Sequence, residues 1–259
     1  MTQLAENLKA PLVELLLSVA DDKLMLGHRN SDWTGLGPIL EEDIAFSSLA
    51  QDEIAHAQIL YELASEFDGR STDVLAFGRD PTEFRCAEIV ELPDDFDWAF
   101  ALCRQFFCDH YDALRLGRMA RSSYAPLAAI AARLAAEEQV HVDHADAWIT
   151  RLGTGTEDSR TRIQAALDRL APVAPMLHEP FEGYDELESA GIYPRPETDM
   201  FEAWSAALHA VTDAAGLTLT LTAPPASDTG GRRGRHSEHL APLLDEMCEV
   251  FRLEPTAAW

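Results

Sequence analysis

The sequence carries one short pattern twice, E-x-x-H, in two long and largely apolar segments. The first copy is Glu53 with His56, and the second is Glu138 with His141. Because a helix turns about 100° per residue, a carboxylate and an imidazole three positions apart lie on one helical face. A single copy is weak evidence, since both residue types are common on exposed helices. Two copies on two long helices favour a helical bundle with a polar centre.

Each copy follows, by about thirty residues, a carboxylate in another apolar segment. Asp21 lies 32 residues before Glu53, and the adjacent Asp22 is an alternative to it. Asp109 lies 29 residues before Glu138. Unpaired carboxylates are costly to bury, so these side chains need partners. One carboxylate from each of two helices and E-x-x-H from the other two is the ligand arrangement of di-iron and di-manganese carboxylate bundles.

The spacing therefore predicts a site for two iron or manganese ions. Its six predicted metal ligands are Asp21, Glu53, His56, Asp109, Glu138 and His141. Four carboxylates would offset the charge of two divalent ions, and one imidazole would complete each coordination sphere. The alternative is a metal-free polar network, in which the aspartates are helix caps or pair with Lys23 or Arg104.

Helical periodicity runs through most of the chain. It predicts four long helices, at about residues 4–27, 39–67, 96–122 and 127–152. A long polar connection with one short helix separates the second from the third, as in ferritin-like bundles. Helices near 157–177, 197–215 and 237–252 would follow; TLTLTL at 217–222 is the one strand-like alternation. We expect an all-α, ferritin-like single domain over 1–259, with a core bundle at about 4–152 and a helical C-terminal extension at about 153–259.

The charge balance limits the partners of this chain. It has 45 Asp and Glu residues against 20 Lys and Arg, a formal net charge of -25. This acidity argues against nucleic acid or an anionic membrane as the main partner. The four cysteines form no CxxC pair, which indicates buried thiols. No apolar run approaches the roughly 18 residues of a membrane span, and the N-terminus lacks a signal-peptide pattern, so we expect a cytoplasmic protein.

Several stretches resemble a known family. They include VADDKLMLGHRNSDW at 19–33, LEEDIAFSSLAQDEIAHA at 40–57 and, above all, TGGRRGRHSEHLAPLLDEM at 229–247. Together they resemble the C-type subunits (PaaC) of the bacterial phenylacetyl-CoA epoxidases, over essentially the whole chain. The last stretch is highly specific, because no general physical pattern requires it.

This resemblance implies a supporting subunit of an oxygen-dependent epoxidase complex of phenylacetate catabolism, with no catalytic residues of its own. Its partners would be the homologous catalytic A-type subunit, which carries the di-iron centre and binds the CoA thioester, and the other subunits; alone it could form a homo-oligomer. The family has lost much of the ligand set, particularly the E-x-x-H of the second helix, which is present here. The alternative is therefore a self-sufficient di-iron or di-manganese oxidase or oxygenase.

A basic cluster stands out in the acidic chain: Arg232, Arg233 and Arg235. We expect it to contact an acidic partner surface or the phosphates of CoA. The alternative is a solvated loop before a helix.

Overall fold

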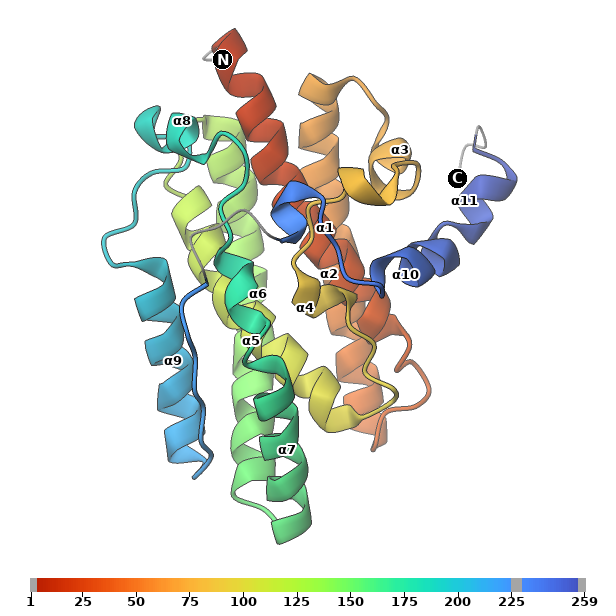
Figure 1. The fold of residues 1–259 in the computed structure, drawn as a ribbon, viewed down its shortest axis with the longest axis vertical. Helices are drawn as coiled ribbons and strands as arrows, with labels where there is room; N and C mark the ends of the chain where they lie inside the picture. The colour runs from red at the N-terminus through yellow and green to blue at the C-terminus, as the bar shows by residue number, and fades with distance from the viewer. Residues whose placement is uncertain (1–3, 225–229, 256–259) are drawn as a thin grey trace. The chain divides into compact units, whose positions relative to one another are not determined.

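The computed structural model describes residues 4–224 and 230–255, and within them it contains helices, turns and irregular segments but no strand (Figure 1). The TLTLTL segment has no regular structure. Contacts divide the chain into two compact units. The N-terminal unit comprises the described residues of 3–93, 180–184 and 228–259, and the central unit those of 94–179 and 185–227. The predicted single domain is not tested by this division and stays a prediction.

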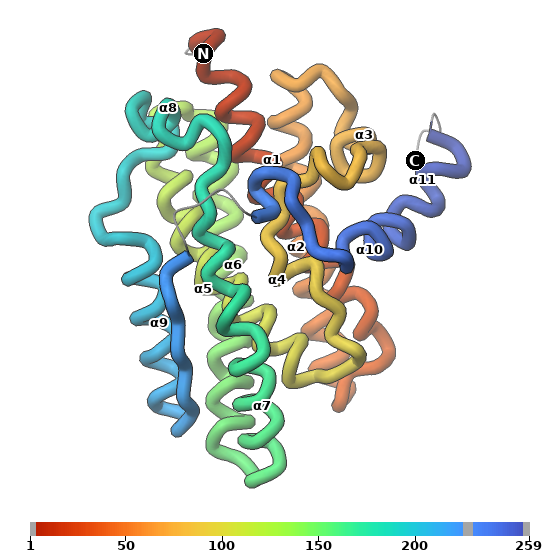
Figure 2. Tube along the Cα trace, viewed as in Figure 1, coloured from red at the N-terminus to blue at the C-terminus, as the bar shows by residue number. Residues whose placement is uncertain are grey.

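The N-terminal unit is built on a hairpin of two long helices. A 3-10 turn, η1 (Glu6–Leu8), leads into α1 (Lys9–Ser31), and α2 (Leu40–Asp68) returns beside it (Figures 1 and 2). The sequence predicted that the first helix ends at Gly27, but α1 continues to Ser31. Gly27 instead allows close packing, since a Cβ there would lie 2.8 Å from Ile54 Cγ1 and 3.0 Å from the Ala50 carbonyl oxygen.

The long connection between the two hairpins is more structured than predicted. The helix α2 ends at Gly69, whose φ of 85° is left-handed and favours glycine. Three short elements follow, in place of the one predicted: α3 (Thr72–Phe77), η2 (Pro81–Glu83) and α4 (Glu88–Glu91). They are held by local caps, such as the Ser71 hydroxyl that accepts from Val74 N at 3.3 Å.

The central unit repeats the hairpin with α5 (Trp98–Met119) and α6 (Ala125–Gly153), which lie side by side in Figure 1. Asp97 caps α5 by accepting from Ala99 N at 3.0 Å. Four elements follow: α7 (Glu157–Leu170), η3 (Ala174–His178), α8 (Tyr184–Ser189) and α9 (Met200–Ala214). The helices α7 and α9 pack against both α5 and α6.

The C-terminal segment returns to the N-terminal unit, where it forms η4 (Gly231–Arg233), α10 (Leu240–Met247) and α11 (Glu249–Leu253). The predicted C-terminal extension is thus shared between the two units. The all-α class is confirmed, and the order of elements, with a long connection between two helical hairpins, is that of ferritin-like proteins. Among residues 4–224 and 230–255, none of the helices has the length and apolar character of a membrane span.

Candidate functional site

The central unit brings three of the six predicted ligands together. Asp109 lies on α5, and Glu138 and His141 lie one turn apart on α6. All three are fully buried, and each offers a ligand atom within 4.8 Å of the others. Glu138 Oε2 lies 3.8 Å from His141 Nδ1. Gln105 Nε2 donates to Asp109 Oδ1 at 2.5 Å and so orients that carboxylate.

The donor types of this cluster suit a metal ion. Two carboxylates and one imidazole are the ligands that iron and manganese share in helical carboxylate sites. The amide of Gln105 fixes a candidate carboxylate ligand in the way that hydrogen bonds around metal centres commonly do. In this unit, the residues fit the predicted chemistry.

In the N-terminal unit, two of the predicted ligands, Glu53 and Asp21, are paired with basic side chains. Glu53 Oε2 accepts a hydrogen bond from Lys23 Nζ at 2.8 Å, and both side chains are fully buried. An ammonium group of the protein thus already pairs with the Glu53 carboxylate. His56, one turn further along α2, is 1% exposed.

Asp21 is held by three partners from its own unit. Arg79 donates to both of its carboxylate oxygens, the Tyr61 hydroxyl donates to Oδ1 at 2.6 Å, and Arg85 N donates to Oδ2 at 2.6 Å. Burial, and then the negative charge of Asp21, raise the pKa of Tyr61 well above its usual value, so the phenol stays a donor. The role of Asp21 as a metal ligand stays a prediction, and it would require the carboxylate to leave these partners.

Asp22, the alternative ligand, pairs with Arg232 from the far end of the chain. Arg232 Nη1 donates to Asp22 Oδ1 at 2.8 Å and Nη2 to Oδ2 at 2.7 Å, a bidentate pair. Ala87 N also donates to Oδ1, at 2.8 Å. The expectation that Arg232 contacts a partner is therefore wrong, because its guanidinium is buried against its own chain. For Arg233 and Arg235 that expectation stays a prediction.

Sequence reasoning missed Arg79 and Tyr61 and left Lys23 among the alternatives. Lys23 directly follows the two aspartates, and a buried carboxylate calls for a nearby cation, so the local charge pattern could have identified it. Arg79 is 58 residues from Asp21. Helical periodicity relates only residues a few positions apart, so it could not predict this pair.

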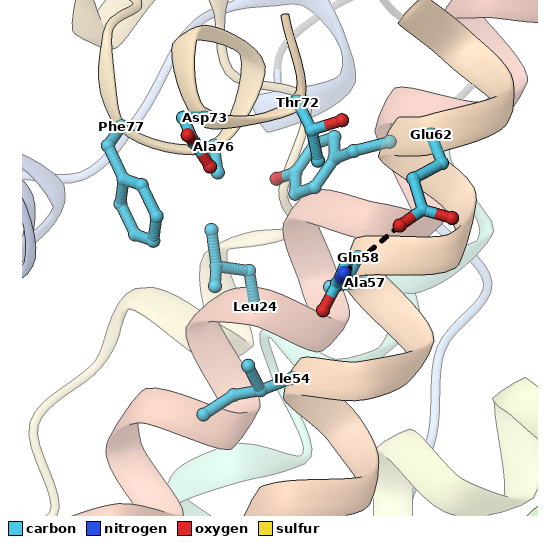
Figure 3. A pocket seen from close by; sticks show the side chains of 10 residues that line it. Leu24, Ile54, Ala57, Gln58, Glu62, Thr72, Asp73, Ala76 and Phe77 are labelled. Carbon is cyan, nitrogen blue, oxygen red and sulfur yellow. Dashed lines mark hydrogen bonds between the residues drawn. The ribbon is translucent and has the colours of Figure 1, made fainter. Parts of the chain in front are cut away.

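The N-terminal unit also has a surface pocket of about 320 Å³ between α1, α2 and α3 (Figure 3). Leu24, Ile54 and Phe77 form apolar walls. Glu62 and Asp73 bring carboxylates, and Gln58 Nε2 donates to Glu62 Oε1 at 3.0 Å. None of the six predicted metal ligands lines this pocket. It contacts the predicted ligand set only through Tyr61, which lines the pocket and donates to Asp21.

Comparison with known proteins identifies relatives of the whole chain. Residues 1–259 match the family described as phenylacetic acid catabolic protein. The chain is 33% identical, over 249 residues, to the C subunit of 1,2-phenylacetyl-CoA epoxidase from Escherichia coli (strain K12). The matched region covers 96% of this chain and 99% of that relative.

Proposed function

Because the chain belongs to the phenylacetic acid catabolic protein family, we propose that it is the C subunit of a 1,2-phenylacetyl-CoA epoxidase. The observation that carries the proposal is the end-to-end match to such a subunit, at 33% identity over 96% of this chain and 99% of the relative. A relative of similar length, matched nearly throughout, supports the same place in the same assembly. The partners would be a homologous catalytic A-type subunit and the other subunits, in the cytoplasm, and alone the chain would self-associate.

The contacts of the N-terminal unit support a structural role for this chain. The Glu53 carboxylate is paired with the Lys23 ammonium, and Asp21 is paired with Arg79. Buried carboxylates that already have protein cations are satisfied without a metal, and removal of either partner would leave a buried charge unpaired. This pairing is the arrangement expected of side chains with a structural role.

The central unit supplies the residues that would hold an ion. Asp109, Glu138 and His141 would bind iron or manganese through two carboxylates and one imidazole. A bound ion would supply the capacity to react with oxygen. The full set of six ligands does not fit the contacts of the N-terminal unit, so we assign the oxidative chemistry of the complex to the catalytic partner.

The alternative is a self-sufficient oxidase or oxygenase with a di-metal centre. It would require Glu53 to exchange the Lys23 ammonium for a metal ion, and Asp21 to leave Arg79, Tyr61 and Arg85. Each of these exchanges breaks buried ionic or hydrogen-bonded contacts. The contacts of Glu53 and Asp21 thus argue against that alternative.

Co-expression with the cognate catalytic subunit tests the proposal. We expect the two chains to co-purify, and phenylacetyl-CoA epoxidation, with reductase and oxygen, to require both. The variant Glu138→Gln/His141→Gln in this chain tests whether its candidate metal ligands are needed for the epoxidation. If catalysis belongs to the partner, the variant complex retains activity within about tenfold, a change that corresponds to about 1.4 kcal/mol in the barrier.

Two results would contradict the proposal. One is a chain that stays separate from its cognate catalytic subunit at micromolar concentration. The other is reductant-dependent oxygen consumption by this chain alone that the double substitution abolishes, which would favour the self-sufficient oxidase.

A further inference from the structure

A second group of potential metal ligands lies in the N-terminal unit, away from the residues discussed above. It consists of Cys86, Glu91 and His236. Cys86 lies between η2 and α4, Glu91 is the last residue of α4, and His236 follows η4. Cys86 Sγ lies 3.7 Å from Glu91 Oε1 and 3.9 Å from His236 Nδ1, and the latter two atoms are 2.6 Å apart. Three donor atoms of three kinds thus converge on one point.

The surroundings of these side chains fix their orientation. His236 Nε2 lies 3.1 Å from the Phe84 carbonyl oxygen, which can only accept, so this nitrogen carries a hydrogen. Glu91 Oε2 accepts from Ser237 N at 2.8 Å and from Ser237 Oγ at 2.7 Å. The remaining polar atoms, His236 Nδ1 and Glu91 Oε1, are therefore directed at each other and at Cys86. Ligating histidines and carboxylates are commonly held in this way by a second set of hydrogen bonds.

We propose that Cys86, Glu91 and His236 form a binding site for one divalent metal ion, of which Zn²⁺ is the best match. One sulfur, one nitrogen and one oxygen donor are a mixed set that suits a borderline ion. Tetrahedral zinc would separate these donor atoms by about 3.3–3.6 Å. The two sulfur distances are within a few tenths of an ångström of this range. The Glu91–His236 pair would open by less than about 1 Å, and water would take the fourth position.

The exchange of protons for metal leaves the charge of the site unchanged. In the metal-free form, Nε2 donates to a carbonyl, and Nδ1 lies 2.6 Å from a carboxylate oxygen, so one hydrogen bond and its one proton join the two side chains beside a neutral thiol. Burial, and then the charge of Glu91, raise the pKa of the Cys86 thiol well above its usual value. Binding of M²⁺ releases the proton that joins His236 to Glu91 and the proton of the Cys86 thiol. The sum of charges is zero before and after, so the metal adds no net charge to a buried site.

The site would join two distant parts of the sequence. It would fasten the segment after η4 to the connection that follows α2, within one compact unit. In the chain without metal, the hydrogen bond between His236 and Glu91 already makes this link. A metal ion would make it tighter, because binding free energy that requires the folded arrangement stabilises that arrangement.

Titration of the full chain with Co²⁺, followed by absorption, tests the proposal. We expect a thiolate-to-cobalt charge-transfer band that saturates at one ion per chain, is displaced by Zn²⁺ and is accompanied by release of about two protons per ion. The variant Cys86→Ser should lose the band. The matched control is Cys103→Ser, a fully buried thiol of the central unit whose Sγ donates to the Ile163 carbonyl. It should keep the band.

The sulfur ligand distinguishes this site from any ion at Glu138 and His141. The variant Glu138→Gln/His141→Gln should therefore leave the band unchanged. If Cys86→Ser does not fold, X-ray absorption of the zinc-loaded wild type decides the matter, with one sulfur expected at about 2.3 Å. A wild type without the band, a band that persists in a folded Cys86→Ser variant, or a zinc spectrum without sulfur would overturn the proposal.

Discussion

The α1–α2 and α5–α6 hairpins carry the same sequence scheme but use it differently. In each, a carboxylate on the first helix precedes an E-x-x-H on the second. On α5 and α6, Asp109 lies within reach of Glu138 and His141. On α1 and α2, Asp21 and Glu53 are each bound to a basic side chain of the same unit. The spacing thus determines which side chains face inward, while the neighbouring cations determine whether they are available to a ligand.

The strongest test of this contrast is Arg79→Met, which removes the cation of Asp21. The Arg79 guanidinium lies 4.0 Å from the centre of the Phe84 ring, and methionine keeps an apolar side chain beside that ring. Leaving a buried carboxylate without its cation costs about 3–5 kcal/mol. We expect a drop of that size in the free energy of unfolding by urea. The control Arg162→Met removes an exposed pair with Asp158 and should cost less than about 0.5 kcal/mol. A similarly small loss at Arg79 would mean that Asp21 obtains a cation elsewhere.

The Lys23–Glu53 pair permits a double-mutant cycle. Lys23→Met and Glu53→Gln should each destabilise the protein, Lys23→Met by about 3–5 kcal/mol because it removes the cation of a buried carboxylate. The double variant should recover about 1–3 kcal/mol of the summed losses. Elemental analysis after anaerobic iron loading sharpens the test. If Lys23→Met bound more iron than the wild type, the ammonium would be a replaceable substitute for a metal ion.

A smaller effect is expected for Tyr61→Phe, which removes the hydroxyl that donates to Asp21. The loss of a hydrogen bond to a charged group is about 1.5–3 kcal/mol at neutral pH. The folded pKa of Tyr61 is raised, so the wild type holds this proton above about pH 10 while the unfolded chain releases it. The free energy of unfolding of the wild type should therefore fall as pH rises above about 10. The variant should show a shallower fall in alkaline urea titrations; an equal slope would contradict this role.

The substitution of one glycine in each hairpin by alanine compares the packing of the two hairpins. Gly27→Ala would place a Cβ 2.8 Å from Ile54 Cγ1, so we expect a loss of about 1–3 kcal/mol. At Gly117, on α5, no described atom of another element lies within 4 Å of the position that a Cβ would take. Gly117→Ala should therefore gain about 0.5–1 kcal/mol. Thermal unfolding of both variants provides the measurement. Equal shifts would show that the two hairpins tolerate a methyl group alike.

The sequence allowed the helical class and the long helices to be predicted because both depend on local periodicity. The four long helices begin and end within a few residues of expectation. The positions of Asp109, Glu138 and His141 followed from the same periodicity. The pairing of Asp21 with Arg79 and of Asp22 with Arg232 did not, because these contacts join residues 58 and 210 positions apart. The return of the C-terminal segment to the N-terminal unit was missed for the same reason.

The pair between Asp22 and Arg232 has a consequence for protein synthesis. A ribosome adds about 5–20 residues per second, so the 210 residues between these partners take about 10–40 s to make. During that time the α1–α2 hairpin has emerged while the guanidinium that balances Asp22 does not yet exist. The N-terminal unit is thus completed by residues that are translated long after its first two helices. A nascent or truncated chain that stops before Arg232 would expose an unfinished N-terminal unit to chaperones and proteases.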